Sequence, residues 1–244
     1  MTATTRNHTW LGCEVGGDTA LVRRIEGATF AFALGPALGE PDRTNRLSAL
    51  IEAFGADLRS VSHCRQVHGS SVRHVDATPG TLGPVGDGDG LVTTVPAHGV
   101  LVWTADCVPV LLSGGGVVAA IHSGWRGCAA DVVGSAVRTI EDRTGTPARD
   151  LSAAIGPAVC GECYQVGAEV PRALGAFDLD ESRWLHRDRV DLRGFLTARL
   201  ESIGLPPDQI ETVGGCTAES PVLASYRRDG EKAGRQWALA FLNV

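Results

Sequence analysis

The sequence lacks the features that would place the protein at a membrane or on nucleic acid. No apolar run approaches the roughly 20 residues that a membrane-spanning helix requires. The 22 Lys and Arg residues are outnumbered by 28 Asp and Glu residues, and the net charge of −6 leaves no basic stripe for a phosphate backbone. Residues 1–15 also lack the basic-then-apolar pattern of an export signal. We therefore expect a cytoplasmic protein that binds neither membranes nor nucleic acid.

The sequence also lacks a regular cysteine framework. Seven cysteines, an odd number, are scattered over positions 13, 64, 107, 128, 160, 163 and 216. Without an export signal, this usage favours free thiols or metal ligands over a set of disulfides.

Internal repeats, low-complexity tracts and linkers are absent as well. A chain of 244 residues with 43% hydrophobic residues is long enough to bury a full core. Short apolar runs typical of strands interleave with amphipathic helical patterns along the chain. These features favour one α/β domain that spans residues 1–244.

Three helices are predicted from apolar residues at helical spacing. Leu47, Leu50 and Phe54 lie on one face of the first helix, which Gly55 is placed to end. The other two helices are expected over 129–140, and over 192–203 with Asp191 as N-cap.

Short apolar runs predict the strands. They are expected at 10–15, 19–24, 29–34, 100–104, 117–121, 151–155, 210–214 and 237–242, with a strand pair within 61–75. We interpret 78–90 and 225–230 as loops and leave 160–177 open between a loop and a short helix.

Two of the buried strands end in residues that can bind a metal. Cys107 follows the run 100–104, and His122 follows the run 117–121. Groups at the end of a rigid strand are well placed for chemistry. With His68 from the preceding strand pair, they form a Cys and His set of the type that zinc prefers, with a fourth position left open. The alternative is a hydrogen-bonded structural histidine and an inert buried cysteine.

Two other motifs are interpreted as structural. Cys160 and Cys163 have the C-x-x-C spacing of redox and zinc motifs, but no second cysteine pair completes a four-cysteine site. Gly114–Gly116 lacks the Lys-Ser/Thr of a phosphate loop, so we expect a flexible turn between two strands.

Four arginines are candidate anion ligands: Arg126, Arg227, Arg228 and Arg235. Arg227 and Arg228 lie in a polar segment that reads as a solvated turn. If this turn folds over the strand ends, its guanidinium groups can hold a phosphate or a carboxylate.

Several motifs together strongly resemble the YfiH family, also known as the laccase-domain or DUF152 family and as the purine nucleoside phosphorylase or polyphenol oxidase family. The resemblance covers about residue 61 to the C-terminus. The motifs are Gln66–Gly69, Asp89–Thr93, Thr104–Val110, His122–Gly127, Ile155–Pro157, Cys163–Gly167, Cys216-Thr217 and Ser225–Gly230.

The resemblance implies a four-layer α/β/β/α sandwich that binds zinc through His68, Cys107 and His122. It also implies phosphorolysis of adenosine, inosine and methylthioadenosine, and deamination of adenosine to inosine. Asn45-Arg46 is similar to the family's Asn-Arg pair at a helix start, so Arg46 is expected to face phosphate or substrate. Arg227 matches another arginine of the family's active site.

The region before the Asn45-Arg46 pair departs from the family pattern. Residues Gly27–Pro41 look shortened and lack the family's Leu-Asn-Leu-Gly segment. Leu223-Ala224 replaces an aromatic pair that often precedes the Ser-Tyr-Arg-Arg motif. We expect differences in the substrate contacts of this region.

The mechanistic hypothesis assigns Cys107, Arg46, Arg227 and Asp106 to catalysis. A zinc-activated water would attack purine C6 in deamination. Arg46 and Arg227, with Arg126 and Arg228, would bind phosphate and substrate for phosphorolysis. Asp106 would orient a ligand or shuttle a proton, or would only cap a backbone segment. Small purine nucleosides and phosphate are the expected partners of a monomer or weak homodimer.

Three other functions remain open at this point. Copper at the same ligands would make the protein a polyphenol oxidase, although seven histidines are few for a multicopper enzyme. Cys107 with a histidine base could act as the nucleophile of a hydrolase on cell-wall precursors. The protein could also bind zinc or nucleosides without turnover.

Overall fold

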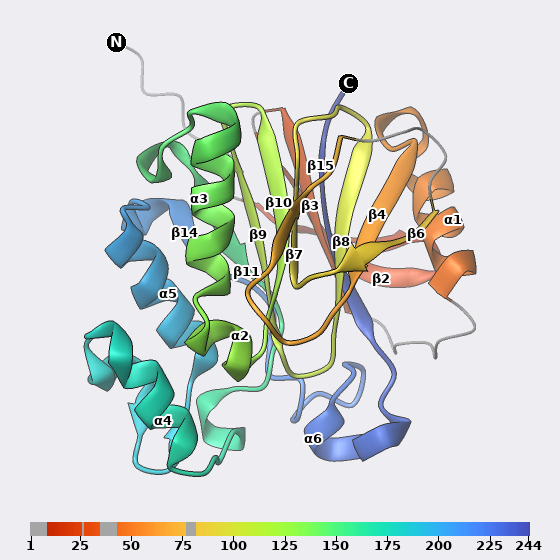
Figure 1. The fold of residues 1–244 in the computed structure, drawn as a ribbon. Coiled ribbons are helices and arrows are strands. Elements are labelled where there is room, and N and C mark those ends of the chain that lie inside the picture. Colours follow the sequence, from red (N-terminus) through yellow and green to blue (C-terminus); the bar gives the residue numbers. More distant parts are fainter. Residues whose placement is uncertain (1–8, 26, 35–42, 77–81) are drawn as a thin grey trace.

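The structure is a computed structural model that describes residues 9–25, 27–34, 43–76 and 82–244. Two large mixed sheets pack face to face, and helices cover the outer face of each (Figure 1). The expected α/β/β/α sandwich is confirmed.

The first sheet has seven strands, and its central strand, β15, is the last in sequence. Neighbouring strands of this sheet are antiparallel from β1 to β8, and they are parallel from β8 through β4 to β6. In spatial order the strands are β1 (Leu11–Val15), β2 (Asp18–Ile25), β3 (Ala28–Ala33), β15 (Gln236–Leu242), β8 (His98–Thr104), β4 (Ser60–Arg65) and β6 (Leu82–Asp87).

The second sheet has six strands, with β9 and β10 forming a central hairpin through Gly115 and Gly116. Both glycines have positive φ, as the tight turn requires. In spatial order the strands are β14 (Ile210–Thr212), β11 (Ser152–Ile155), β9 (Val108–Gly114), β10 (Val117–Ser123), β7 (Gly90–Thr93) and β5 (Val72–His74); a separate small sheet pairs β12 (Leu185–His186) with β13 (Arg189–Val190).

The core has three apolar clusters, which separate the four layers. The middle cluster lies between the sheets and includes Phe30, Phe32 and Val100. The other two lie under the helices on the outer faces. Every residue of β8, β10 and β15 is buried, because both faces of these strands are covered. Their near-continuous apolar sequences follow from this position.

The helices are unequally divided between the two faces. One helix, α1 (Arg43–Phe54), packs Leu47 and Leu50 on the seven-stranded sheet. The other sheet is covered by α3 (Val132–Thr144) and α5 (Leu192–Ile203), with the short α2 (Trp125–Ala129) and α4 (Glu169–Leu174) beside them. None of the helices in the described ranges is long and apolar enough to cross a membrane.

The helix caps predicted from the sequence are present. The Asp191 side chain accepts a hydrogen bond from the N–H of Arg193, and Gly204 ends α5 with a φ of 112°. The helix expected over 129–140 is two helices, because Asp131 interrupts it with a φ of 62°. The Asp131 carboxylate binds Arg199 and Arg138, which compensates for the strained backbone.

The structure corrects the prediction of strands and loops in the following places. The strands predicted within 61–75 do not pair, because β4 lies in one sheet and β5 in the other. The predicted loop 78–90 contains β6, an edge strand, which is the position in a sheet that tolerates Pro84. The polar loop at 225–230 contains the one-turn helix α6 (Tyr226–Asp229), capped by the Ser225 side chain.

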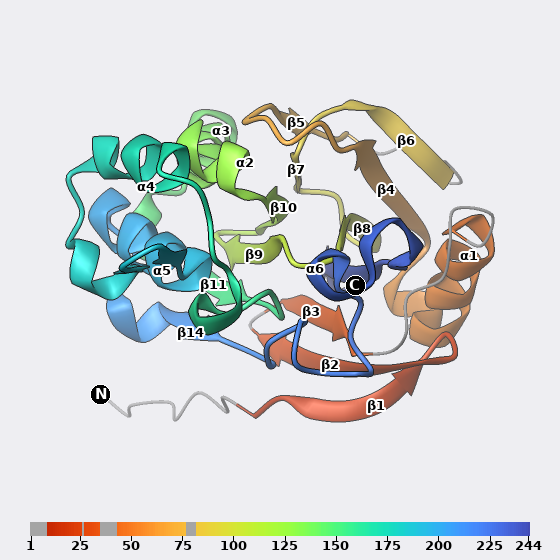
Figure 2. The ribbon, with the colours of Figure 1, turned by 90° about the horizontal axis from the view of Figure 1, so that it is seen from below.

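The strand register gathers one set of loops at a single end of the sandwich. Strands β4 and β8 are parallel, so their ends meet there, and β8 leads directly into β9 of the other sheet. Strand β10 ends opposite the start of β9, and β11 ends at the same side. Strand β15 begins opposite the end of β8. Figure 2 views the molecule from below and shows α6 over the space between the two sheets.

Candidate metal centre

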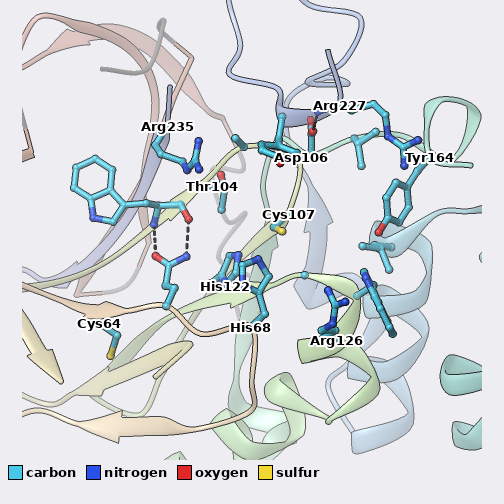
Figure 3. A pocket seen from close by; sticks show the side chains of 18 of the residues that line it. Cys64, His68, Thr104, Asp106, Cys107, His122, Arg126, Tyr164, Arg227 and Arg235 are labelled. Atoms are coloured by element: carbon cyan, nitrogen blue, oxygen red, sulfur yellow. Dashed lines mark hydrogen bonds between the residues drawn. The ribbon is translucent and has the colours of Figure 1, made fainter. Parts of the chain in front are cut away.

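His68, Cys107 and His122 come together at this end of the sandwich. Their ligand atoms all lie within 4.8 Å of one another, and the two imidazole rings are 4.8 Å apart at 83°. Each comes from a different part of the chain: His68 from the connection between β4 and β5, Cys107 from the connection between β8 and β9, and His122 from the end of strand β10. Figure 3 shows the three side chains clustered on the floor of a pocket.

Asp89 organises two of the three ligands. Its buried carboxylate accepts hydrogen bonds from the N–H groups of His68 at 2.9 Å and Gly69 at 2.6 Å, with longer contacts to Val67. The same carboxylate lies 2.9 Å from Nδ1 of His122. His68 has a φ of 59°, a backbone conformation that these hydrogen bonds stabilise. Asp89 therefore fixes the turn that carries His68 and leaves Nε2 of His122 as the nitrogen available to a metal.

The electrostatics of the cluster favour a thiolate. Burial raises the pKa of Cys107, but hydrogen bonds from His122 and His68 outweigh burial and lower this pKa to about 6. Burial lowers the pKa of His122, but Asp89 and Cys107 outweigh burial and raise it to about 9. Burial also disfavours charge on Asp89, yet its hydrogen bonds lower its pKa below the ordinary value. The thiolate is the form of cysteine that binds metals.

The backbone leaves no spare room beside the ligands. A Cβ atom at Gly124 would lie 3.0 Å from Sγ of Cys107 and 3.0 Å from Cδ2 of His68. The glycine after β10 thus lets the chain turn into α2 without displacing either ligand.

These residues fit a resident metal ion. The set supplies one thiolate and two imidazoles, which are ligand types of zinc and copper, and a buried carboxylate holds one imidazole from behind. Three protein ligands leave a further coordination position open toward the pocket.

A cavity of about 800 Å³ opens above the three ligands. This volume falls within the range of pockets that enclose small molecules. Its lining combines the three ligands with aromatic residues, Trp103, Trp125, Tyr164 and Tyr226, and with the cations Arg65, Arg126, Arg227 and Arg235.

Asp106 lines the pocket, but its carboxylate is already engaged. Thr217 Oγ1 donates to one oxygen at 2.6 Å, and the N–H of Arg227 donates to the other at 2.5 Å. Asp106 has a φ of 82°, and its own carbonyl accepts the N–H of Val159. The residue therefore ties three loops together around Cys107. This geometry favours the capping role among the alternatives for Asp106.

The arginines divide into two groups. Arg227 lies over the Tyr164 ring, with its Cζ 5.2 Å from the ring centre, and it donates to the carbonyl of Gln165. Arg126 lies over Trp125, on the same side of the pocket as Tyr164, and Arg235 lies on the other side (Figure 3). All three keep guanidinium groups at the pocket, as expected for anion ligands.

Arg228 belongs to the other group and requires a correction. Its guanidinium group donates to the carbonyls of Thr217, Ser220 and Leu223 and pairs with Asp229. It is not among the residues that line the cavity. Arg228 therefore holds the loop before α6 in shape and is unsuited to the phosphate-binding role expected for it.

The remaining expectations concern residues at the N-terminal side. Arg46 lies in α1, but its side chain is outside the part of the chain that the structure describes, as is the second half of the segment Gly27–Pro41, from residue 35 on. The Leu223-Ala224 pair is buried and does not line the cavity.

Two functional residues escaped the sequence analysis. Asp89 was part of a motif to which no role was assigned. The sequence feature that could have identified it is a carboxylate placed directly before a wholly buried strand. Gln66 was likewise only part of a motif. Its side-chain amide pairs with both backbone groups of Trp103 at 2.7 and 2.8 Å, which joins the ends of β4 and β8 (Figure 3).

Comparison with known proteins agrees with this fold. Residues 39–243 match the family model described as multi-copper polyphenol oxidoreductase laccase. The structure is similar to YfiH from Bacillus licheniformis, with a TM-score of 0.82 and 25% identity, covering 92% of this chain and 96% of the other. It is also similar to YlmD from Geobacillus stearothermophilus, with a TM-score of 0.81 and 25% identity, covering 97% and 100%.

Closer relatives in sequence carry the name of an enzyme. A protein from Streptomyces coelicolor named purine nucleoside phosphorylase is 38% identical over 213 residues, which cover 84% of this chain and 85% of the relative. A protein of the same name from Deinococcus radiodurans is 37% identical over 202 residues, which cover 80% and 74%.

Proposed function

This chain belongs to the family described as multi-copper polyphenol oxidoreductase laccase, and we propose that it is a metal-dependent purine nucleoside enzyme. The observation that carries the proposal is the pocket. A three-ligand metal set forms its floor, arginines stand on its walls, and its volume suits a nucleoside with a phosphate. The names of the relatives from Streptomyces coelicolor and Deinococcus radiodurans support the same substrate class.

We propose zinc as the metal, held by His68, Cys107 and His122. A thiolate with two imidazoles suits zinc, and an open position is typical of catalytic rather than structural zinc sites. When bound, zinc supplies Lewis-acid chemistry at the pocket floor. Asp89 positions the ligands from behind and does not touch the substrate.

In phosphorolysis, phosphate oxygen forms a bond to ribose C1′ while the bond from C1′ to purine N9 breaks. The leaving purine takes the bonding electrons and gains a proton. We propose that Arg227 and Arg126, which both line the pocket on the side of Tyr164, hold the phosphate against C1′, with Arg46 as a further candidate. Their positive charges also offset the phosphate charge that is brought into the pocket.

Tyr164 and the side chains around it are proposed to hold the base. The Tyr164 ring already carries Arg227 over one face, and burial raises the pKa of its hydroxyl to about 12, so the hydroxyl stays protonated at neutral pH. A neutral hydroxyl can donate a hydrogen bond to a purine nitrogen. Asp106 acts as a positioning residue, since it fixes the backbone of Arg227.

Deamination of adenosine is the second proposed activity of the same pocket. Water adds at purine C6, and ammonia leaves, so that adenosine becomes inosine. The metal set supports this activity, because metal-assisted attack of water needs the open position described above. We further propose that residues 1–244 act as a single domain, as a monomer or weak homodimer.

The decisive experiment is chromatography of the products formed from adenosine by purified zinc-loaded protein, with and without phosphate. Adenine that appears only with phosphate identifies a phosphorylase, and inosine in both reactions identifies a deaminase. If neither product forms, the nucleoside proposal is wrong.

The family description also raises copper-dependent oxidation of polyphenols as a second candidate. Thiolate and imidazole suit copper too. However, the three-ligand set is the one histidine-containing group of potential metal ligands within the described residues, and a multicopper site needs more. Phenol-dependent oxygen uptake in proportion to bound copper would favour this candidate over zinc.

A further inference from the structure

A second cluster of metal-binding side chains lies beside the pocket and is not part of it. Cys160, Cys163, Cys216 and Glu219 offer three sulfur atoms and a carboxylate oxygen within 4.8 Å of one another. None of the four lines the cavity. The C-x-x-C motif, interpreted from the sequence as a loop without a partner, therefore has a partner in space.

The cluster consists of two turns with the same spacing. Cys160 and Cys163 stand three positions apart, and Cys216 and Glu219 also stand three positions apart. The N–H of Cys163 donates to the carbonyl of Cys160 at 3.0 Å, so the first turn points both thiols to one side. In the second turn, the N–H of Ser220 donates to the carbonyl of Cys216. Paired short turns of this spacing are typical of structural zinc sites.

Backbone contacts hold the two turns against each other. The N–H of Thr217 donates to the carbonyl of Ala158 at 3.0 Å, as part of an isolated bridge between Ala158 and Cys216. The N–H of Cys160 donates to Sγ of Cys216 at 3.3 Å. Sγ of Cys163 lies 3.7 Å from Oε1 of Glu219. The four side chains are thus brought together by the backbone, before any metal contributes.

We propose that Cys160, Cys163, Cys216 and Glu219 form a second metal site, a closed four-ligand zinc site with a structural role. Three thiolates and one carboxylate complete a tetrahedral shell and leave no position for substrate. Zinc binding releases the thiol protons to solvent, because the ligands are thiolates. A disulfide between any two of the sulfurs would leave the third without a role, whereas a metal uses all four groups.

The position of the site explains what it would stabilise. Cys163 precedes Tyr164, which lines the pocket, and Cys216 precedes Thr217, which donates to Asp106. A metal at the cluster joins these two segments and so fixes one wall of the pocket from outside. The proposal is independent of the nucleoside function, since the site contacts no substrate.

The test is the zinc content of protein that is purified under reducing conditions, loaded with zinc and desalted. Wild type should retain about two zinc ions per chain. The double variant Cys160→Ser, Cys163→Ser should retain one, held by the centre with Cys107, and Cys107→Ala should retain the other. Cys13→Ser, which removes an exposed thiol elsewhere, is the matched control and should retain both.

A cobalt titration separates this proposal from misfolding. In a Cys107→Ala background, cobalt bound at the cluster should show the thiolate charge-transfer absorption, and Glu219→Cys should strengthen both the absorption and the affinity. Glu219 is exposed, so Glu219→Ala should weaken cobalt binding without unfolding the chain. The proposal is overturned if Cys216→Ser binds cobalt as well as its parent. It is also overturned if peptide mapping of native, unreduced protein shows a disulfide within the cluster.

Discussion

Two groups of metal-binding side chains lie at the same end of the sandwich, and they differ in almost every respect. The centre formed by His68, Cys107 and His122 has three ligands, two from separate connections and one from the end of β10, and it opens into a cavity. The cluster formed by Cys160, Cys163, Cys216 and Glu219 has four ligands from two short turns, and none of the four lines that cavity.

The difference shows how position in the fold distinguishes a site suited to catalysis from a site suited to a structural role. Ligands on widely spaced strand ends require the whole sandwich to bring them together, so they stand where both sheets meet above a pocket. Ligands on paired turns need only local geometry and can join two loops. An open shell suits catalysis and a closed shell suits stability.

The largest effect is expected from removing the thiol of the open centre. Cys107→Ala should abolish zinc binding there and lower turnover of purine nucleosides by more than about 100-fold, because the Lewis acid is lost. Bound zinc and initial rates are the measurements. Cys13→Ala, which removes an exposed thiol that lies outside both clusters and does not line the cavity, is the control. An undiminished rate in Cys107→Ala would remove the metal from the mechanism.

Thiol reactivity should differ sharply between Cys107 and Cys163 in metal-free protein. The pKa of Cys107 is lowered to about 6, whereas burial and the neighbouring thiols raise the pKa of Cys163 to about 12. At pH 7 Cys107 is then mainly thiolate and Cys163 is thiol, so iodoacetamide should label Cys107 more than about 100-fold faster.

Labelling of the two kinds of thiol should also depend differently on pH. A lowered pKa keeps the thiolate as pH falls, so Cys107 labelling should decline only below about pH 6. The exposed Cys13, whose pKa is raised, should label only at alkaline pH. Zinc should protect Cys107. Mass spectrometry of labelled peptides measures each site, and equal labelling of Cys107 and Cys163 at pH 7 contradicts the assignment.

Asp89→Asn should weaken the open centre without affecting the closed cluster. The amide has one acceptor oxygen in place of two, so it cannot serve the His68 turn and His122 together. Zinc affinity of the open centre should fall by about 10–100-fold, the usual cost of losing such a partner. Competition with a chelator measures the affinity. Asp87→Asn, at a half-exposed carboxylate nearby, should leave it unchanged.

The smallest effects should separate two adjacent arginines. Arg227→Ala should raise the KM for phosphate by about 10-fold, the value of one charged hydrogen bond. Arg228→Ala should instead lower the melting temperature and leave that KM nearly unchanged, because the N–H groups of the Arg228 guanidinium donate to backbone carbonyls. Steady-state kinetics and thermal unfolding decide the matter. The reverse result would show that Arg228 faces the substrate.

Much of the fold could be predicted because local pattern and burial agree. The apolar runs of β8, β10 and β15 reflect strands covered on both faces, and Asp191 and Gly204 mark the two ends of α5. The partition into two sheets could not be predicted. A sequence of strands does not say where the chain crosses from one sheet to the other, so β4 and β5 looked like a pair.

The ligands of the candidate site could be predicted from the sequence, but the residues that position these ligands could not. His68, Cys107 and His122 were identified mainly through the resemblance to a family, since no local spacing connects them. Asp89 remained without a role, because its partners are backbone N–H groups that leave no sequence signature. The partner of the C-x-x-C motif was missed for a similar reason: Cys163 and Glu219 are 56 positions apart.

The place of β15 has a consequence for how the molecule is made. This strand lies between β3 and β8, so the halves of the seven-stranded sheet stay unjoined until Gln236–Leu242 has been synthesised. Until then, β3 and β8 each have one edge without a neighbouring strand, and exposed strand edges favour pairing with other chains. A nascent chain paused shortly before Gln236 is therefore the form most in need of a chaperone.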